Sequence, residues 1–561
     1  MSLLAIDTLS VTIDDTEILR EVSLTLAPGE ILGLVGESGS GKSMTALAVM
    51  GLLPHRAARA GAIRLDGREI TALDEPALCR LRGAEVGMIF QEPMTALDPL
   101  MTIGDQVAET LRIHRHLGRA EARAIARERL DRVGLTEPRF PLTLYPHELS
   151  GGQRQRVAIA LAIALRPRLL IADEPTTALD VTTQAGVLSL LRDLVREEGM
   201  GLLLITHDLA VTATMADRVA VMQAGRIVEE GPTEALFRAP KVPYTRALLA
   251  AATPRPAAPS QEYLDQEKTD ASFSWQKYSK SDAAPLLAVE GAVRRYRLPR
   301  PSPFAPHPEL RAVDGVSFTL APGESLGLVG ESGCGKSTLT RAILGLDPLS
   351  AGRITLSGHA VSPQMPRQRR TDVQAVFQDP YASFDPRQRV ERLLAEPFHL
   401  TGRPDDWRAR VAQALEEVGL SPGDATKYIH EFSGGQRQRL AIARALIIRP
   451  KLIVLDEAVS ALDLRIRAQV LELLARLQRS HDLAYLFISH DLNVVRAVTQ
   501  RCLVMQAGKI VESGPTERLF TAPEHSCTQR LLAAAPRIPA EWQAEAEDRG
   551  AAPDPEVFSA R

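Results

Sequence analysis

The stretch Leu26-Ala-Pro-Gly-Glu-Ile-Leu-Gly-Leu-Val-Gly-Glu-Ser-Gly-Ser-Gly-Lys-Ser43 decides the fold of this chain. It returns almost unchanged as Leu320-Ala-Pro-Gly-Glu-Ser-Leu-Gly-Leu-Val-Gly-Glu-Ser-Gly-Cys-Gly-Lys-Ser337. Each copy ends in Gly-x-x-x-x-Gly-Lys-Ser, after an apolar run and before a helical stretch, which is the context of a phosphate-binding loop. The glycines let backbone N–H groups surround a phosphate at a helix start, where the helix dipole favours negative charge. We therefore expect two nucleotide sites.

These two phosphate loops supply most of the expected ATP-binding residues. Lys42 and Lys336 are expected to hold the β- and γ-phosphates, and Ser43 and Ser337 to ligate Mg²⁺. The loops consist of Gly36, Glu37, Ser38, Gly39, Ser40, Gly41, Lys42 and Ser43 in the first copy and Gly330, Glu331, Ser332, Gly333, Cys334, Gly335, Lys336 and Ser337 in the second.

The repeat extends over most of the 561 residues. The string Ser-Gly-Gly-Gln-Arg-Gln-Arg occurs at 150–156 and again at 433–439, and an Asp-Glu pair and a histidine follow each at the same spacing. A period this long predicts tandem domains. The predicted division is one domain at 1–252, a linker at 253–284, a second domain at 285–537 with a proline-rich insert at 299–308, and a fraying tail at 538–561.

Apolar runs within each copy predict an α/β architecture, present twice. The runs at 31–35, 169–172 and 202–205 are short, do not alternate with polar residues and are bounded by glycine or charge. Such runs are typical of strands buried on both faces of a parallel sheet. Segments 119–133 and 153–165 are expected to be helices.

Two carboxylates end a buried strand in each copy, as Asp173-Glu174 and as Asp456-Glu457. The aspartates suit Mg²⁺ binding through water, and the glutamates can polarise a water for in-line attack on the γ-phosphate. A strand that ends in Asp-Glu is, on its own, more often a plain solvated strand end. The phosphate loop upstream in the same copy favours the catalytic interpretation.

A second glycine-rich run, which we call the signature segment, occurs as Leu149-Ser-Gly-Gly-Gln153 and as Phe432-Ser-Gly-Gly-Gln436. It opens a helix with a hydroxyl at its start, which predicts a second phosphate nest. Together these strings resemble the ABC ATPases over nearly the whole chain. The resemblance implies two tandem P-loop domains, each with a RecA-like core and a helical subdomain. It also implies ATP contacts from Ser150, Gly151, Gly152, Gln153, Ser433, Gly434, Gly435 and Gln436.

The same resemblance assigns catalytic roles, with His207 and His490 as γ-phosphate switches, although a lone histidine near a strand end is usually a plain surface or core residue. The implied catalytic set is Glu174, Glu457, His207, His490, Gln91 and Gln378, and the implied Mg²⁺ set is Ser43, Gln91, Asp173, Ser337, Gln378 and Asp456. The resemblance further implies head-to-tail pairing, in which each phosphate loop meets the signature segment of the other copy. One chain would then supply both ATP sites.

One position departs from the pattern of this family, and one residue of the second phosphate loop carries a separate hypothesis. At the position of the aromatic residue that usually stacks on adenine in this family, the first copy has Ile13. In the second copy, Tyr296 is the candidate for this role. Tyr296 could instead be ordinary edge-strand packing. Cys334 lies inside the second phosphate loop, and the hypothesis for it is a thiolate favoured by the helix dipole and Lys336, hence sensitivity to thiol reagents. The alternative is a small, tolerated loop residue.

The strings around the glutamines, at 90–99 and 377–386, resemble the dipeptide/oligopeptide/nickel branch of ABC importers, as do Tyr145-Pro-His-Glu and the segments 243–249 and 527–532. Two ATPases fused in one chain are most similar to the Yej-type importers of oligopeptides and microcin C, with glutathione or other small-solute importers as the alternative. The rival class is a soluble ATPase acting on ribosomes or nucleic acid. Against it, the linker is proline-bearing and not periodic, and the chain shows neither heptads nor cysteine clusters.

Composition agrees with this interpretation. There are 66 Lys+Arg against 69 Asp+Glu, which gives a net charge of −3 and no support for a nucleic-acid-coating role. The 4 cysteines form no Cys-x-x-Cys pair, so neither a disulfide framework nor a zinc site is indicated. The longest apolar run, 157–165, is too short to span a membrane. The resemblance to ABC importers implies a peripheral protein at the cytoplasmic face of the inner membrane, with two permease subunits and an extracytoplasmic binding protein as partners and ATP and Mg²⁺ as cofactors.

Overall fold

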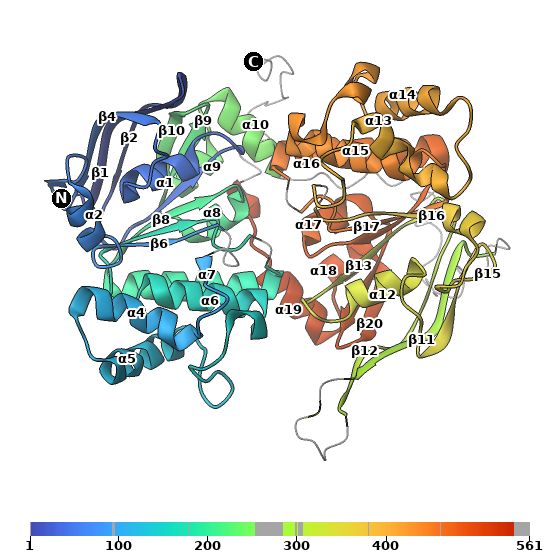
Figure 1. Ribbon diagram of the computed structural model, residues 1–561, viewed down its shortest axis with the longest axis horizontal. Coiled ribbons are helices and arrows are strands. Elements are labelled where there is room, and N and C mark those ends of the chain that lie inside the picture. The colour runs from blue at the N-terminus through green and yellow to red at the C-terminus, as the bar shows by residue number, and fades with distance from the viewer. Residues whose placement is uncertain are drawn as a thin grey trace. The chain divides into compact units, whose positions relative to one another are not determined.

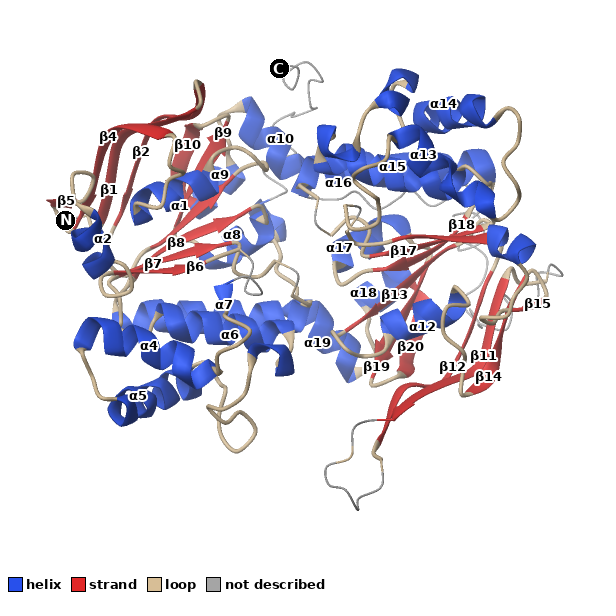
Figure 2. Ribbon diagram, viewed as in Figure 1, coloured by secondary structure: helices blue, strands red, loops and turns tan. Residues whose placement is uncertain are grey.

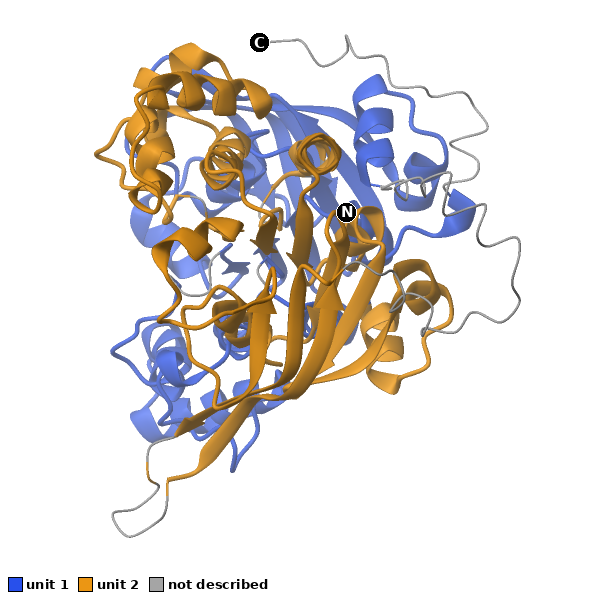
Figure 3. Ribbon diagram, turned by 90° about the vertical axis from the view of Figure 1, so that its right-hand side faces the viewer, with its two compact units in different colours: residues 1–253, 535–561 blue, residues 254–534 orange. Residues whose placement is uncertain are grey.

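The computed structural model describes residues 2–91, 96–177, 179–252, 284–297, 300, 307–379, 381–460 and 462–542. The chain divides into two compact units, which we call unit 1 (residues 1–253 and 535–561) and unit 2 (residues 254–534) (Figure 3). The expected linker lies outside the described residues up to position 283, as do most of the proline-rich insert and the tail from position 543. The domain boundaries given above stay predictions.

Unit 1 carries its strands and helices in the α/β order that the apolar runs predict (Figures 1 and 2). Its strands are β1 (Leu4–Ile13), β2 (Thr16–Leu26), β3 (Ile31–Val35), β4 (Ala57–Leu65), β5 (Arg68–Glu69), β6 (Val86–Ile89), β7 (Leu169–Asp173), β8 (Gly201–Thr206), β9 (Arg218–Gln223) and β10 (Arg226–Pro232). Its helices are α1 (Lys42–Met50), α2 (Glu75–Leu81), α4 (Ile103–Arg115), α5 (Arg119–Arg132), α6 (Gly151–Ala162), α7 (Val181–Glu198), α8 (Leu209–Met215), α9 (Thr233–Arg238) and α10 (Pro243–Ala252), with a 3-10 turn at Pro146–Glu148.

The strands of unit 1 form two sheets. The larger has the order β10-β9-β3-β8-β7-β6, and its neighbours are parallel except for the β9–β10 hairpin. The three apolar runs predicted as buried parallel strands are β3, β7 and β8, so the predicted α/β fold is confirmed. The smaller sheet is antiparallel, in the order β2-β1-β4-β5, and the sequence analysis did not predict it.

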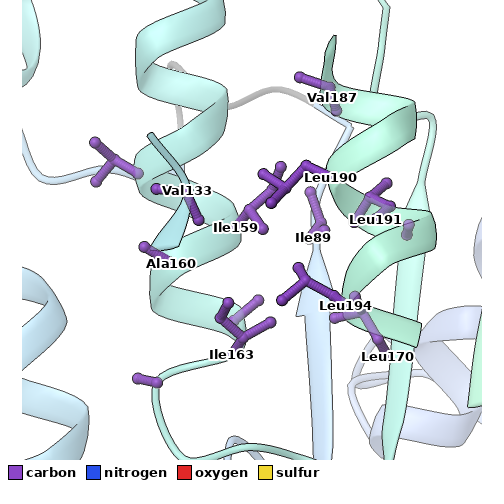
Figure 4. Packing of buried hydrophobic residues seen from close by; sticks show 14 of the residues in the cluster. Ile89, Val133, Ile159, Ala160, Ile163, Leu170, Val187, Leu190, Leu191 and Leu194 are labelled. Atoms are coloured by element: carbon purple, nitrogen blue, oxygen red, sulfur yellow. The ribbon is translucent and has the colours of Figure 1, made fainter. Parts of the chain in front are cut away.

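The larger sheet is buried on both faces because successive side chains on a strand point to opposite sides. On β7, Leu170 and Ala172 pack towards α6 and α7, whereas Leu169 and Ile171 pack towards α1 and the smaller sheet. Figure 4 shows the first of these layers, where α6 and α7 face one another through isoleucine and leucine side chains over β6. This packing holds the carboxyl ends of the strands in fixed register.

Unit 2 repeats this plan, with sheet orders β16-β17-β18-β13-β19-β20 and β12-β11-β14-β15. Its strands are β11 (Leu287–Arg297), β12 (Glu309–Leu320), β13 (Ser325–Gly330), β14 (Ala351–Leu356), β15 (His359–Ala360), β16 (Val373–Val376), β17 (Leu452–Asp456), β18 (Ala484–Ile488), β19 (Arg501–Gln506) and β20 (Lys509–Pro515). Its helices are α12 (Lys336–Ile343), α13 (Val390–Ala395), α14 (Trp407–Glu417), α15 (Gly434–Leu446), α16 (Leu464–His481), α17 (Leu492–Val498), α18 (Thr516–Thr521) and α19 (Ser526–Ala534). Among the helices described in either unit, none has the length and hydrophobicity needed to span a lipid bilayer.

Candidate functional site

The predicted catalytic residues of unit 1 lie at the carboxyl ends of neighbouring parallel strands. The phosphate loop joins β3 to α1, Asp173 and Glu174 end β7, and His207 follows β8. Gln91 comes after β6, the next strand of the same sheet. Parallel strands present their carboxyl ends at one edge of a sheet, so residues far apart in the sequence converge there.

The shape of the phosphate loop depends on its glycines. A Cβ atom at Gly36 would lie 2.2 Å from the backbone oxygen of Met222, and at Gly330 the same distance separates it from the oxygen of Met505. Gly41 has a φ of +106°, in the left-handed region that favours glycine. Any larger residue at Gly36 or Gly330 would push the loop away from the sheet.

The lysine of each loop folds back onto the loop itself. Lys42 Nζ donates to the backbone oxygens of Gly36 (2.8 Å) and Glu37 (2.9 Å), and its side chain is buried. Lys336 Nζ does the same in unit 2, at 2.7 Å from Gly330 O and 3.0 Å from Glu331 O. Each ammonium therefore lies inside the concave face of its loop, where the phosphates are expected.

Asp173 carries the features of a cation ligand. Its Oδ1 atom is buried and has no hydrogen-bond partner among the described residues, while the Ser43 side chain is hydrogen bonded to this carboxylate. Burial raises the pKa of Asp173, against the opposing effects of Ser43 and Lys42. A buried, unpartnered carboxylate oxygen beside a serine hydroxyl fits a hard cation such as Mg²⁺, which prefers oxygen ligands.

Asp456 occupies the corresponding place in unit 2. Burial and the adjacent Glu457 raise its pKa to about 6, although Lys336 acts in the opposite direction. The Asp456 carboxyl is thus harder to ionise than an ordinary aspartate. A bound cation would remove this penalty, because opposite charge favours the ionised form.

Glu174 contacts three other side chains of the unit 1 site. Its carboxylate lies 3.0 Å from His207 Nδ1 and accepts hydrogen bonds from Gln91 Nε2 (3.2 Å) and Thr177 Oγ1 (2.9 Å). Burial acts to raise the pKa of Glu174, but His207, Thr177 and Lys42 outweigh it and bring that pKa to about 2. The structure therefore brings three predicted residues, Gln91, Glu174 and His207, into one contact cluster.

Unit 2 assembles a looser version of this cluster. His490 Nδ1 lies 3.3 Å from Glu457 Oε1. Burial opposes ionisation of Glu457, yet the bond to His490 lowers its pKa below the ordinary value. Gln378 is exposed and, within the described residues, makes no hydrogen bond to Glu457, unlike Gln91 in unit 1.

The signature segments lie elsewhere in their own units, at the starts of α6 and α15. Ser150 Oγ accepts from the Gln153 N–H (3.4 Å) and Gln153 Oε1 accepts from the Ser150 N–H (2.9 Å), which is a capping box. Ser433 and Gln436 pair in the same way. No hydrogen bond among the described residues joins either signature segment to the phosphate loop of the same unit. The polar side chains thus cap the helix, and the serine at each start is exposed.

The structure overturns the thiolate hypothesis for Cys334. Its side chain is buried, and burial raises the pKa of the thiol by more than Lys336 lowers it. The stacking role of Tyr296 stays a prediction. The Tyr296 hydroxyl lies 3.4 Å from Asp347 Oδ2, and the Arg294 guanidinium lies 4.8 Å from the ring centroid. Ile13 in unit 1 packs against the apolar core.

Two residues at the unit 1 site were not predicted. Thr177 bonds to Glu174, and the only signal for it is a hydroxyl three positions after the glutamate. Tyr244, in α10, is buried, and its hydroxyl accepts a hydrogen bond from the backbone N–H of Glu37 (3.2 Å) in the phosphate loop. Segment 243–249 drew attention only through family resemblance, because no sequence pattern links it to a loop some 200 residues away.

The family of the chain follows from comparison with known proteins. A family model described as ABC transporter matches residues 19–177 and 313–460. A second model, described as the C-terminal region of oligopeptide/dipeptide transporters, matches residues 228–275 and 511–560. The chain belongs to the ABC transporter family, as an ATP-binding protein with two tandem ATPase domains, and it is an ATPase coupled to transport.

Its relatives extend over almost the whole chain. It is 47% identical over 543 residues to the glutathione import ATP-binding protein GsiA of Shigella sonnei (strain Ss046), and equally to that of Escherichia coli (strain K12). Each alignment covers 92% of this chain and 86% of the relative. A solved dimeric ATP-binding cassette in a post-hydrolysis state, bound to ADP and Pi, is 31% identical over 41% of this chain and 98% of its own, with a TM-score of 0.37.

Proposed function

We propose that this chain is the ATP-hydrolysing subunit of an importer of small peptides, and that glutathione is the first solute to test. The observation that carries the hydrolytic part is the cluster in which Glu174 contacts Gln91, Thr177 and His207 beside the phosphate loop. The match to the oligopeptide/dipeptide transporter C-terminal region supports a peptide-like solute. The relatives named for glutathione import favour the tripeptide over the Yej-type oligopeptide or microcin C solute expected from the sequence.

In the first step of the proposed reaction, Lys42 and His207 change their hydrogen-bond partners. Lys42 would exchange the carbonyls of Gly36 and Glu37 for phosphate oxygens, because the negatively charged triphosphate attracts the ammonium more strongly than neutral acceptors do. His207 would turn from Glu174 to the γ-phosphate. Loss of this partner raises the pKa of Glu174 from its low value, which makes the carboxylate a better base for the attacking water.

Mg²⁺ is proposed to bind at Ser43, Asp173 and Gln91 in unit 1, and at Ser337, Asp456 and Gln378 in unit 2. The orphaned Asp173 Oδ1 and the adjacent Ser43 hydroxyl support the first set. When bound, the ion supplies positive charge that offsets the charge developing on the phosphate oxygens. The protein side chains hold the nucleotide and position the water.

The second half of each ATP site is proposed to be the signature segment of the other unit. The capping boxes satisfy the Ser150 and Gln153 side chains, while the glycines leave the helix start accessible to an anion. We extend the same proposal to Ser433–Gln436. Hydrolysis and release would then separate the two halves, and this motion would be passed on to the permeases.

Permease docking is proposed at the surface near the glutamine loops. Exposed large apolar residues gather in these sequence regions of both units, and exposed apolar patches often mark interaction sites. They are Phe90 and Leu100 in unit 1 and Phe377 and Tyr381 in unit 2. With two permease subunits bound there, the chain would lie at the cytoplasmic face of the inner membrane, and an extracytoplasmic binding protein would deliver the solute.

Reconstitution tests this proposal directly. The chain is co-expressed with candidate permeases, inserted into proteoliposomes, and assayed for uptake of labelled glutathione, of a dipeptide and of a longer peptide. We expect ATP-dependent uptake of glutathione, absent in the Lys42→Ala, Lys336→Ala double variant. Uptake of longer peptides alone would correct the solute. Co-sedimentation with ribosomes and no association with permeases would favour the rival class and contradict the proposal.

A further inference from the structure

An arginine of α16 joins the two loops that carry the proposed catalytic residues of unit 2. Arg467 Nη1 lies 2.6 Å from Asp491 Oδ2, in the loop immediately after His490. Its Nη2 donates to the backbone oxygens of Ser460 (3.3 Å) and Leu462 (3.2 Å), in the loop that follows Glu457. One guanidinium thus connects the glutamate loop to the histidine loop.

The bridge is largely shielded from water. The Arg467 side chain is 14% exposed and that of Asp491 is 22% exposed, so the ion pair is screened less than a surface pair. Asp491 is itself fixed, because its Oδ1 accepts from the N–H groups of Asn493 and Val494 at the start of α17. The partner of Arg467 is therefore anchored to a helix, and the arginine transmits that anchoring to the glutamate loop.

Unit 1 organises its glutamate differently. The counterpart of Arg467 there is Gln184, which donates to Thr176 Oγ1 at 3.3 Å. Glu174 is held directly by the side chains of Gln91, Thr177 and His207. The neutral amide of Gln184 is enough in unit 1, because the Glu174 carboxylate is already held by three side chains.

In unit 2 these direct contacts are fewer. The hydroxyl of Ser460, the counterpart of Thr177, donates to the backbone oxygen of Glu457 (2.8 Å) and not to its carboxylate. Among the described residues, His490 is the partner of the Glu457 carboxylate, at 3.3 Å. The geometry of this pair depends on how the two loops are held relative to one another.

We infer that Arg467 is a positioning residue for the Glu457 site, which fixes the glutamate loop against the histidine loop. Arg467 holds the Glu457 region in place indirectly, whereas unit 1 holds Glu174 in place through side chains bonded to its carboxylate. This inference rests on the proposed hydrolytic function of the Glu457 site. The two units then differ in function at a residue that lies outside the phosphate loops, the Asp-Glu pairs and the signature segments.

The first test is steady-state ATP turnover of the full chain carrying Arg467→Gln, the residue that unit 1 has at this position. This variant and all those compared with it also carry Lys42→Ala, so that the unit 1 site does not contribute to turnover. We expect kcat to fall about tenfold, since small displacements of catalytic groups have effects of that order, while KM for ATP stays within about twofold. Rates are normalised to bound nucleotide, so a loss of folded protein does not count as a loss of turnover. Arg467→Lys keeps the charge without the planar fork and should give an intermediate kcat.

The control is Arg479→Gln, which removes an exposed arginine from the same helix and should leave kcat unchanged. Asp491→Asn keeps the helix-capping oxygen and removes the charge. If Arg467 acts through Asp491, this variant should also lower kcat, and the double variant should be no slower than the slower single variant, because the two residues form one unit.

The inference would be overturned by an unchanged kcat in Arg467→Gln, by an equal loss in Arg479→Gln, or by independent, multiplicative losses for Arg467→Gln and Asp491→Asn. A rise in KM alone would also contradict it, since that would indicate a role in nucleotide binding. The test needs only ATP turnover. Failure of glutathione uptake therefore leaves it unaffected, and an inactive wild-type chain would contradict the proposed function itself.

Discussion

Glu174 and Glu457 both adopt a left-handed backbone conformation, with φ of 48° and 52°. This conformation costs a non-glycine residue on the order of 1 kcal/mol and tends to occur at functional sites.

In the chain with Glu174→Gln and Glu457→Gln, we expect ATP turnover to fall at least about a hundredfold, because the general base is lost. ATP should still bind, since the phosphate loops are intact.

Filter binding of labelled ATP beside a phosphate-release assay measures both properties of this variant. The matched control is Glu148→Gln with Glu431→Gln, which changes two glutamates that cap 3-10 turns before the signature segments. Near-normal turnover in the catalytic pair would show that neither glutamate is the base.

Thiol chemistry distinguishes the cysteines at the same scale. Cys79 is exposed on α2, whereas Cys334, Cys502 and Cys527 are buried. Burial raises the pKa of Cys334 and raises that of Cys502 to about 12, so little thiolate is present at neutral pH. We expect maleimide at pH 7 to label Cys79 first without loss of ATP turnover, and Cys334 to react faster as the pH rises. Mass spectrometry of labelled peptides checks this order, and rapid ATP-protected labelling of Cys334 at pH 7 would contradict it.

Sequence spacing could locate the residues of the phosphate loop because the motif determines its own backbone. It could not predict Thr177 or Arg467. The bond of Thr177 to Glu174 depends on a side-chain rotamer. In unit 2 the equivalent hydroxyl, that of Ser460, donates to the backbone oxygen of Glu457 instead. Arg467 finds its partner 24 residues away through tertiary packing. The thiolate expectation for Cys334 was wrong because the sequence shows a nearby lysine but not burial.

At the scale of the element, α10 supports the phosphate loop of unit 1. Glu229 of β10 accepts from the N–H groups of Lys241 and Val242 just before α10, and Tyr244 of α10 accepts from the N–H of Glu37. In unit 2, Cys527 stands in place of the tyrosine, and Arg530 of α19 pairs with the Glu331 side chain at 3.6 Å. The helices α10 and α19 therefore contact corresponding loop residues, Glu37 and Glu331, by different chemistry.

Removal of the Tyr244 hydroxyl tests this support. Tyr244→Phe keeps the ring and leaves the half-buried Glu37 N–H without this acceptor, at a cost of about 1 kcal/mol. We expect the Kd for ATP at the Lys42 site to rise about fivefold if the cost is expressed in binding. Titration of a Lys336→Ala chain isolates that site, and Tyr145→Phe, an exposed tyrosine of the same unit, is the control. An unchanged Kd would mean that α10 packs on the loop without influencing it.

The inner strands β3, β7 and β8 of the six-stranded sheet were predictable as elements because strands buried on both faces are continuous apolar runs. The four-stranded antiparallel sheet was not predicted. Its strand β4 mixes buried and exposed positions irregularly, and β1 has bulges between Ile6 and Leu9 and between Asp7 and Ser10 that break the alternation. Only the end of β2 alternates regularly, over five residues, 22–26. The contact of α10 with the phosphate loop could not be predicted either, because its partner in that loop is 207 residues away in the sequence.

At the scale of the whole molecule, repetition in the sequence predicts two ATPase domains, and two compact units carry the two copies. The copies are not equivalent. Unit 1 surrounds its glutamate with three side chains, and unit 2 relies on His490 and the Arg467 bridge. Spacing alone could not reveal this difference, because every catalytic residue type is present in both copies.

Covalent joining of the two units leads to the last prediction. If each ATP site pairs the phosphate loop of one unit with the signature segment of the other, one chain suffices for both sites. Tethering gives the units an effective concentration on the order of millimolar, so dilution of the chain should not separate them. We expect ATP turnover per chain to stay constant within about twofold over a hundredfold dilution, and the Glu174→Gln, Glu457→Gln chain to retain two ATP molecules per chain.

Turnover against chain concentration, together with light scattering at each concentration, measures this property. The control is the chain cut by a protease site inserted in the linker at 253–284, whose turnover should fall on dilution because the halves can now separate. Turnover of the intact chain that falls in step with a dimer-to-monomer transition would show that sites form between chains, and it would contradict pairing within one. Constant turnover in both the intact and the cut chain would mean that each unit hydrolyses ATP without the signature segment of the other.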